Sequence, residues 1–363
     1  MHMSACGAGM AMMSRSAARS QDTVTTAKKP DLVRIAAIQT RNNPKINGLQ
    51  TDPFQEGFSL DHVYKSIELW LDWYEELFAQ AAKDKCKLAV VTEDFTHIFS
   101  TALFLDDRSV FRSTVERQTP LIAERLSAVA KKHSMYIVAC YFASENEIIY
   151  NVADLFGPNQ ELVGRYRKVH MPQYEMWQVT QGDEFPAFET DIGWISMLIC
   201  YDQMWPEAAA CCAMNGAQLI CQPSAAVLKD WYMQARARDN QVHYLSSTAK
   251  ESMISTPKAE IVANGKEQDP AVVWADVDIV NGSMGDEYFM ETLYSGIQDH
   301  KERHLKFRRP ETYKVLTSSS PPIADHYPKG GVANTDKAIA KVYETVKKIR
   351  TRHPDYRNYH WRW

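Results

Sequence analysis

The sequence predicts an α/β protein whose sheets contain both parallel and antiparallel strands. Short apolar runs of strand length alternate along the chain with longer segments in which apolar residues recur at helical spacing. A Gly-Pro-Asn turn at 157–159 lies between two strand-like runs, which is typical of a hairpin and therefore of antiparallel pairing. Alternation of strands and helices, combined with hairpins, indicates the α/β class with mixed sheets.

The first elements are a strand and a long helix. Residues 33–39 form an apolar run of strand length, and the polar segment after it, rich in Asn, predicts a loop. Apolar residues at helical spacing then predict a helix over 60–83. A fully buried strand is expected over 88–91, and it stops just before Glu93.

The next segment predicts a second helix and a hairpin. We expect a helix over 119–132, because Pro120 lies in its first turn, where the missing N–H of proline costs no hydrogen bond. A strand is expected over 135–142. The runs 148–156 and 161–166 flank the Gly-Pro-Asn turn and form the hairpin.

The second half of the chain continues the alternation. A strand over 195–199 ends at Cys200, and the helix after it begins at Pro206 and is closed by an Asn-Gly pair at 215–216. The remaining expected elements are a strand over 219–221, a helix over 235–244, a strand over 246–249 and a hairpin across 263–265.

Both ends of the chain differ from the globular domain, which we expect over residues 31–317. Residues 1–30 are rich in Ser, Ala, Thr and Met and carry several basic residues but a single acid, Asp22. That composition is typical of a disordered tail and also of a mitochondrial transit segment, so both interpretations stay open. Residues 318–363 contain a Ser-Pro linker, one amphipathic helix predicted over 339–349 and an aromatic tail. Such an extension needs a surface to dock on, either its own domain or a partner subunit.

Composition argues against several classes of protein. The net charge is −4 and the charges are interspersed, so no basic field for nucleic acid exists. No apolar run is long enough to cross a bilayer. The seven cysteines are odd in number, follow no signal peptide and form no CxxC pairs, which argues against a disulfide framework and a zinc site. We therefore expect free thiols and a cytoplasmic protein, or a mitochondrial one if residues 1–30 are a transit segment.

Most of the cysteines need no chemical role. Cys140 and Cys221 lie in apolar strands, and Cys211 and Cys212 lie on the helix that begins at Pro206. All four are expected to be small residues of the core.

Three residues stand at the ends of apolar runs. They are Glu93, Lys168 and Cys200, and strand ends are where side chains converge on a ligand site. Each also has an ordinary structural interpretation: an acid in a turn, a lysine in the basic run 165–168, and a buried cysteine. Position alone does not establish a site.

Each of the three lies in a distinctive local sequence. Residues 199–207 are Ile-Cys-Tyr-Asp-Gln-Met-Trp-Pro-Glu, and residues 164–172 are Gly-Arg-Tyr-Arg-Lys-Val-His-Met-Pro. They resemble the nucleophile and lysine motifs of the nitrilase (carbon–nitrogen hydrolase) superfamily. Glu93 stands where that superfamily has its first glutamate, although Thr92 replaces the usual Pro before it. The motifs follow the superfamily's order: glutamate, lysine, cysteine.

The resemblance covers roughly residues 32 to 317. Glu175 matches a second glutamate found in many amidase and carbamoylase members. Residues 236–240 and 308–313 resemble two later stretches of the superfamily, whereas Gln181 stands where Pro is common. The resemblance implies a four-layer α-β-β-α sandwich, with two sheets face to face and helices outside. It also implies a homodimer or higher homo-oligomer, for which residues 318–363 are a candidate arm.

The resemblance also assigns roles to residues. Cys200 is the expected nucleophile, Glu93 takes and returns protons, and Lys168 stabilises the oxyanion together with the backbone N–H of Tyr201. Glu175 is expected to position the substrate nitrogen and the catalytic groups. The chemistry implies neither a metal nor another cofactor.

Three aromatic residues near the motifs have two interpretations each. Trp177 and Trp205 flank the motifs and are candidates for pocket walls, although aromatic packing explains them equally well. His97 is a candidate for the entrance of the site, or a hydrogen-bonded structural histidine.

The residues after Cys200 favour one branch of chemistry. Tyr201, Asp202 and Gln203 resemble the motif of amidases and carbamoylases, whereas nitrilases more often have Trp-Glu after the cysteine. The sequence therefore predicts a hydrolase of a primary amide or an N-carbamoyl (ureido) group that releases ammonia through a cysteine thioester. The alternatives are nitrilase or nitrile hydratase-type activity in the same superfamily, and a non-catalytic scaffold of the same fold. The intact catalytic residues argue against the scaffold.

Overall fold

The computed structural model describes residues 31–52, 56–99, 108–172, 175–227, 229–282, 300–326 and 344. The tail predicted over 1–30 and the aromatic end of the chain lie outside these residues. Of the helix predicted over 339–349, only Glu344 is described, in helical backbone. All elements below belong to one structural unit, which spans Leu32–Trp363.

Two six-stranded sheets form the centre of the described part of the chain. The first has the order β12-β1-β2-β3-β4-β5 and the second the order β11-β10-β9-β8-β7-β6. The strands of the first sheet are β1 (Val33–Gln39), β2 (Leu88–Val90), β3 (Tyr136–Glu145), β4 (Ile148–Phe156), β5 (Leu162–Arg167) and β12 (Ala271–Val277). Those of the second are β6 (Ala187–Thr190), β7 (Gly193–Met197), β8 (Leu219–Pro223), β9 (His243–Ser247), β10 (Met253–Ser255) and β11 (Ile261–Asn264).

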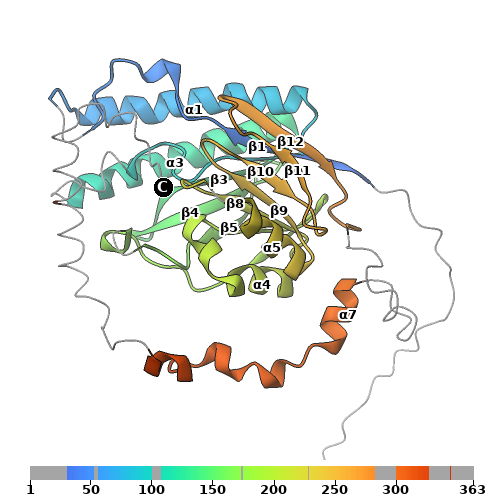
Figure 1. The fold of residues 1–363 in the computed structure, drawn as a ribbon. Helices are drawn as coiled ribbons and strands as arrows, with labels where there is room; N and C mark the ends of the chain where they lie inside the picture. Colours follow the sequence, from blue (N-terminus) through green and yellow to red (C-terminus); the bar gives the residue numbers. More distant parts are fainter. Residues whose placement is uncertain are drawn as a thin grey trace, which may run out of the picture. The chain divides into compact units, whose positions relative to one another are not determined.

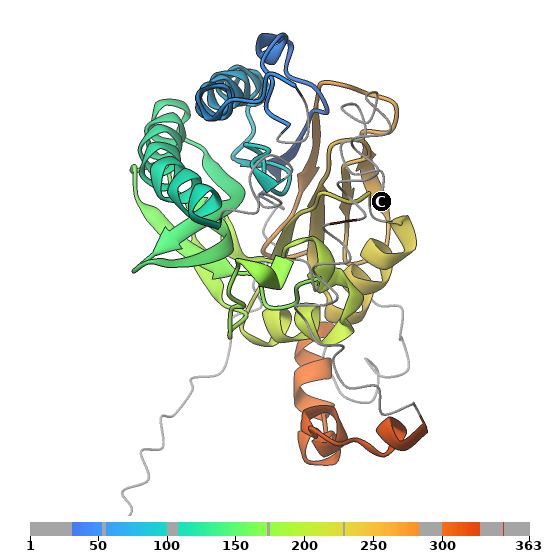
Figure 2. The same cartoon turned by 90° about the vertical axis from the view of Figure 1, so that its left-hand side faces the viewer.

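Helices cover the outer face of each sheet, so the predicted α-β-β-α sandwich is confirmed. Helices α1 (Leu60–Lys83) and α3 (Arg108–His133) pack on the first sheet, and α4 (Pro206–Met214) and α5 (Asp230–Asn240) pack on the second. The layers can be followed in Figure 1 and, from the side, in Figure 2. Each sheet has parallel strands at its centre and antiparallel strands toward its edges, as the mixed pattern predicted.

Strand β1 shows why the central strands are apolar throughout. Ala36 and Ile38 pack with α1 and α3, whereas Ile35 and Ala37 face the second sheet. All four are fully buried, because successive side chains point to opposite faces and both faces are covered.

The topology brings the ends of β2, β5 and β7 together with the candidate residues. Glu93 follows the end of β2 and Lys168 comes directly after β5, both in the first sheet. Cys200 follows β7 in the second sheet. The site is therefore built from two sheets that face each other.

Helix α3 begins much earlier than predicted. It starts at Arg108 rather than at Thr119, and Pro120 lies inside it. The prediction took Pro120 as a start signal, but Phe111 and Val115 extend the buried face of the helix by two turns and outweigh it. The Thr119 hydroxyl donates to the Val115 carbonyl (2.7 Å) instead of capping a helix start.

The segment after β8 also differs from the prediction. Helix α5 ends at Asn240, not at 244, because Gln241 adopts a left-handed backbone (φ 55°) that terminates it. Strand β9 therefore begins at His243 instead of 246. The hairpin predicted across 263–265 is wrong: β11 pairs with β10, and the chain then crosses to the other sheet, where β12 pairs with β1.

No helix among the described residues is long and apolar enough to cross a membrane.

The described residues after β12 form helix α7 (His300–Phe307) and three short 3-10 helices, at Pro310–Thr312, Lys314–Thr317 and Pro322–His326. Residues 318–321 of the predicted Ser-Pro linker lie between the last two of these helices, and Pro322 begins the last one.

The proline inside α3 generates a prediction about stability. Pro120 is exposed, so its replacement removes no packing, and alanine supplies the N–H that the helix interior lacks. We expect Pro120→Ala to raise the free energy of unfolding by about 1–2 kcal/mol, since part of the helix penalty is offset by the greater freedom of the unfolded chain. Urea unfolding measures the change, with the exposed Glu124→Ala on the same helix as a control expected to change it little. A lower stability for Pro120→Ala would contradict the prediction.

Candidate active site

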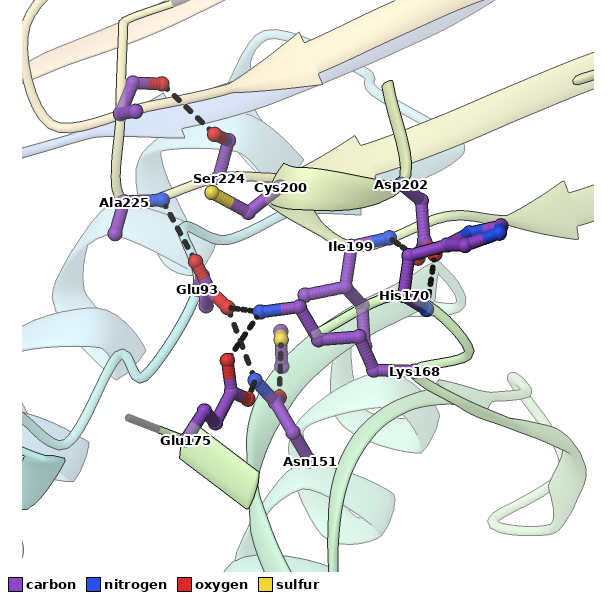
Figure 3. A network of polar contacts seen from close by, with 12 residues as sticks. Glu93, Asn151, Lys168, His170, Glu175, Ile199, Cys200, Asp202, Ser224 and Ala225 are labelled. Atoms are coloured by element: carbon purple, nitrogen blue, oxygen red, sulfur yellow. Dashed lines mark hydrogen bonds and ion pairs between the residues drawn. The ribbon is translucent and has the colours of Figure 1, made fainter. Parts of the chain in front are cut away.

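A buried lysine lies between two buried carboxylates. The Lys168 ammonium donates to Glu93 Oε1 and to Glu175 Oε2, each at 2.7 Å. All three side chains are almost inaccessible to solvent. Figure 3 shows the three converging, with Glu175 delivered by the 3-10 helix Glu175–Trp177. The structure thus brings together three of the four residues expected to be catalytic.

Asn151 joins the two carboxylates on their other side. Its amide nitrogen donates to Glu93 Oε1 (2.9 Å) and to Glu175 Oε1 (2.7 Å), and its side-chain oxygen accepts from the Cys140 thiol (3.4 Å). The interpretation of the sequence missed Asn151. The signal was a polar residue in the middle of the buried strand β4, where apolar side chains are expected.

The charges of this cluster are strongly coupled. Burial would lower the pKa of Lys168, but Glu175 and Glu93 outweigh it and raise that pKa well above its usual value. Burial would raise the pKa of Glu93, but Lys168 and further donors hold it below its usual value. Burial and the Glu93 charge raise the pKa of Glu175, which Lys168 offsets only in part. The two carboxyls therefore differ, with Glu93 the stronger acid and ionised at rest.

Cys200 approaches the cluster from the second sheet. It opens the 3-10 helix Cys200–Met204, and its backbone lies in the left-handed region (φ 40°). A residue other than glycine adopts this conformation only when its surroundings hold it, and such residues gather at functional sites. The Gln222 side chain donates to the Cys200 carbonyl at 2.9 Å and fixes that end of the turn.

The Cys200 thiol lies close to Glu93 and Ser224 (Figure 3), and the charges of Glu93 and Lys168 both act on it. Burial and the Glu93 charge raise the pKa of the thiol to about 12, although Lys168 opposes the rise. At neutral pH the resting nucleophile is therefore a protonated thiol beside an ionised carboxylate that can accept its proton.

Glu93 is held from the second sheet as well. The Ala225 N–H donates to Glu93 Oε2 at 3.1 Å, and the Thr92 hydroxyl donates to the Ser224 carbonyl at 2.8 Å. Thr92, which replaces the usual Pro of the motif, thus ties the end of β2 to the end of β8. The departure from the motif does not disturb Glu93.

Tyr201 and Trp205 pack on one side of the nucleophile turn. The Tyr201 ring is half-exposed and meets Trp205 edge to face, with ring centroids 5.0 Å apart. Trp205 stacks on His170 at 4.1 Å. For Trp205 this favours the aromatic-packing interpretation over a pocket wall.

His97 packs against helix α1. The His97 ring stacks on Trp70 of α1, with centroids 4.2 Å apart, which favours a structural role. The side chain of Trp177 lies outside the described residues. Four other cysteines were expected in the core. Cys140, Cys212 and Cys221 are buried there, but Cys211 is exposed on α4, and for Cys211 the expectation was wrong.

The described residues contain no group of three or more His, Cys, Asp or Glu side chains arranged to hold a metal ion. Lys168 instead provides the positive charge of the cluster.

Comparison with known proteins decides the family. The model of the carbon–nitrogen hydrolases matches residues 35–282, which is most of the chain. The chain belongs to the carbon–nitrogen hydrolase family. This confirms the resemblance to the nitrilase superfamily that the three motifs carry.

Individual relatives in this family are distant. A nitrilase of Pyrococcus abyssi is 28% identical in an alignment of 219 residues that covers 56% of this chain and 82% of that protein. A human omega-amidase is 30% identical over 183 residues, covering 43% of this chain and 66% of that protein. At this distance the relatives leave the substrate open.

Solved structures of the family share the fold. A carbon–nitrogen hydrolase of Helicobacter pylori superimposes with a TM-score of 0.60 at 19% identity, covering 78% of this chain and 98% of that one. An amidase from Nesterenkonia gives a TM-score of 0.56 at 19% identity and covers 78% of this chain and 96% of the other. These superpositions support the two-sheet architecture.

The electrostatics of the cluster predict how the thiol responds to loss of Glu93. The Glu93 charge raises the pKa of Cys200, so Glu93→Gln lowers that pKa and leaves Lys168 to favour the thiolate. We expect iodoacetamide to alkylate Cys200 at least about tenfold faster at neutral pH in this variant, since one pKa unit changes the thiolate fraction about tenfold. Residue-resolved mass spectrometry measures the rate. The exposed Cys211 in the same sample is the internal control, and an unchanged or slower rate at Cys200 would contradict the prediction.

Proposed function

We propose that this protein is an amidohydrolase that cleaves a primary amide or an N-carbamoyl group through a thioester on Cys200. One observation carries the proposal: a cysteine held in strained backbone lies beside an ionised glutamate, which is itself bound to a buried lysine. Nucleophile, base and cation are thus gathered in one site, which is the arrangement that activation of a thiol requires.

In the first half-reaction, Glu93 accepts the thiol proton as Cys200 Sγ attacks the carbonyl carbon. The carbonyl oxygen becomes an oxyanion in the tetrahedral intermediate. Lys168 and the backbone N–H of Tyr201 are its proposed donors, each worth about 3–4 kcal/mol of transition-state stabilisation. Glu93 then returns the proton to the leaving nitrogen, the C–N bond breaks and ammonia departs, with the acyl group left on Cys200.

In the second half-reaction, Glu93 accepts a proton from a water molecule that attacks the thioester. Collapse of the second tetrahedral intermediate breaks the C–S bond. An amide substrate thereby releases a carboxylic acid, whereas an N-carbamoyl substrate releases a carbamic acid, which loses carbon dioxide to give the amine. Glu93 gives its proton back to the Cys200 sulfur, which restores the resting thiol. One carboxyl therefore acts in turn as base, acid, base and acid, and its place beside Cys200 and Lys168 puts it within reach of each proton.

Glu175 has a separate proposed role. Its pKa is raised by burial and by the charge of Glu93, and its oxygens are occupied by Lys168 and Asn151. It does not contact Cys200 in any interaction found among the described residues. We propose that it orients Lys168 and the substrate nitrogen, while Glu93 transfers the protons.

The choice of an amide over a nitrile rests on the motif and on relatives. Tyr201 and Asp202 follow the nucleophile as in amidases and carbamoylases. One relative is an omega-amidase, and an amidase structure of the same fold has been solved as a cysteine-to-alanine variant in complex with butyramide. The Pyrococcus abyssi relative is a nitrilase, so nitrile hydrolysis is the second candidate.

The proposal predicts the substrates that release ammonia. Purified protein is incubated with primary amides, ureido acids, carbamoyl amines and nitriles, and ammonia is measured. We expect ammonia release from members of the first three groups. Cys200→Ala should lower the rate of release by a factor of about 10⁴ or more, because no other group forms the thioester.

Cys211→Ala is the matched control, since Cys211 is exposed on α4, and it should leave the rate within about twofold. Turnover of nitriles but not of amides would favour the second candidate. Equal rates for the native protein and Cys200→Ala would refute catalysis by this site.

We further propose that residues 304–317, at the end of α7 and just after it, form an arm that docks on a second copy of this chain. The superfamily resemblance predicts such an oligomer, although the arm expected from the sequence was residues 318–363. Residues 304–320 are all exposed, yet they include large apolar side chains: Leu305 (53%), Phe307 (62%), Val315 (55%) and Leu316 (64%). A segment that exposes this much apolar surface to solvent is typical of a protein–protein interface. Exposed Met204 and Trp231 near the nucleophile turn and on α5 offer apolar surface of the same kind.

The arm predicts how one charged substitution changes the oligomer. Leu316→Glu places a carboxylate in the proposed interface, so we expect the dimer to dissociate about 100-fold more readily, since an unpaired charge buried in an interface costs a few kcal/mol. Mass photometry across a dilution series measures it. Ser319→Glu, at an exposed polar position of the linker, is the control. A Leu316→Glu protein with the native mass distribution would contradict the arm.

A further inference from the structure

The Asp202 carboxylate is fully buried and is surrounded by four hydrogen-bond donors. Its Oδ1 accepts from the backbone N–H and from Nδ1 of His170, both at 2.9 Å. Its Oδ2 accepts from the Tyr166 hydroxyl (2.7 Å) and from the Ile199 N–H (2.9 Å). A carboxylate needs such a set of donors to remain buried, and the bonds to it are among the stronger ones in proteins.

These donors come from the two segments that carry Lys168 and Cys200. Tyr166 lies in β5, two residues before Lys168, and His170 lies two residues after it. Ile199 directly precedes Cys200. Asp202 therefore fastens the lysine segment of the first sheet to the nucleophile turn of the second (Figure 3).

The same residue also holds the strained turn closed. The Asp202 side chain accepts from the Ile199 N–H, while its own N–H donates to the Ile199 carbonyl at 3.0 Å. These two bonds enclose Cys200, whose φ of 40° persists only under such constraint. The Tyr166 hydroxyl adds to the link, because it also accepts from the Val169 N–H (3.2 Å), next to Lys168.

We propose that Asp202, with Tyr166, is a positioning residue that fixes the Cys200 sulfur against Glu93 and Lys168 without touching the substrate. The inference rests on the proposed hydrolase function for its effect on turnover. When the link is weakened, the turn relaxes toward ordinary backbone, and the sulfur moves away from its base. A displacement of about 1 Å at reacting atoms costs as much as about 100-fold in rate.

A second tyrosine–aspartate pair provides a matched control. The Tyr141 hydroxyl donates to Asp154 Oδ2 at 2.6 Å, and both residues are fully buried, as Tyr166 and Asp202 are. That pair joins β3 to β4 and binds Arg165, with no bond to the nucleophile turn. Tyr141→Phe therefore removes the same kind of hydrogen bond as Tyr166→Phe at a place where only stability is affected.

The experiment compares Tyr166→Phe, Asp202→Asn and Tyr141→Phe with the native protein in two assays. The first is the rate of Cys200 alkylation by iodoacetamide as a function of pH, which needs no substrate. We expect the thiol pKa to fall by at least about one unit in Tyr166→Phe and Asp202→Asn, because the displaced sulfur leaves the Glu93 charge and gains water. It should stay native in Tyr141→Phe.

The second assay is ammonia release from the best amide of the substrate screen. We expect kcat to fall about 10-fold in Tyr166→Phe and about 100-fold in Asp202→Asn, with KM nearly unchanged, since positioning acts on the chemical step. If Asp202→Asn does not fold, Tyr166→Phe by itself still tests the positioning role. If Tyr166→Phe matches Tyr141→Phe in both assays, the positioning role is refuted. If no protein releases ammonia but the alkylation profiles differ as expected, the proposed function fails while the positioning of Cys200 stands.

Discussion

The candidate site depends on the ion pairs that the buried Lys168 ammonium makes with Glu93 and Glu175. A charge without solvent is stable only if it is paired and fully hydrogen-bonded, and here two carboxylates share it at equal distances. The cluster of one cation and two anions needs further donors, which Asn151 and the Ala225 N–H provide. Removal of any one member would leave an uncompensated charge or acceptor. The polar residues around the site are therefore as much a condition for folding as for chemistry.

This requirement explains why the site lies between two sheets. Glu93, Lys168 and Glu175 come from the first sheet or from segments next to it, whereas Cys200 and Ala225 come from the second. The facing sheets exclude water, and each sheet completes the hydrogen bonds of the other. Thr92 and Asp202 are the side chains that join the sheets beside the reacting atoms. The geometry of the candidate site is therefore set by how the two sheets dock, and no single strand determines it.

Much of the fold and the candidate site could be predicted from sequence, for a clear physical reason. Strands β1 and β4 and helix α1 have the predicted bounds, because the strands are compact apolar runs, the helix has a clear helical periodicity, and polar segments or turns follow them. Glu93, Lys168 and Cys200 stand at strand ends within recognisable motifs. Asn151 was missed because one amide inside an apolar strand has no local signature, and its partners are distant in sequence.

The other errors share a cause. Pro120 is a start signal by its local chemistry, and only the buried Phe111 and Val115 keep the helix continuous through it. Strands β11 and β12 follow each other closely in sequence yet join different sheets, which depends on the partners available and not on the turn between them. Local sequence determines what an element is more firmly than where it ends or which neighbour it pairs with.

The raised pKa of the Cys200 thiol also bears on how the protein survives oxidants. Peroxides attack thiolates, and a cysteine that is mostly ionised at rest is converted readily to sulfenic acid and then to irreversible oxides. Because burial and the Glu93 charge raise the pKa of Cys200, the thiol is almost entirely protonated at neutral pH. In the proposed reaction, the sulfur becomes a strong nucleophile only when Glu93 takes its proton, and that transfer is favourable only as a bond to carbon forms. The proposed nucleophile is thus kept between turnovers in the form that resists oxidative damage.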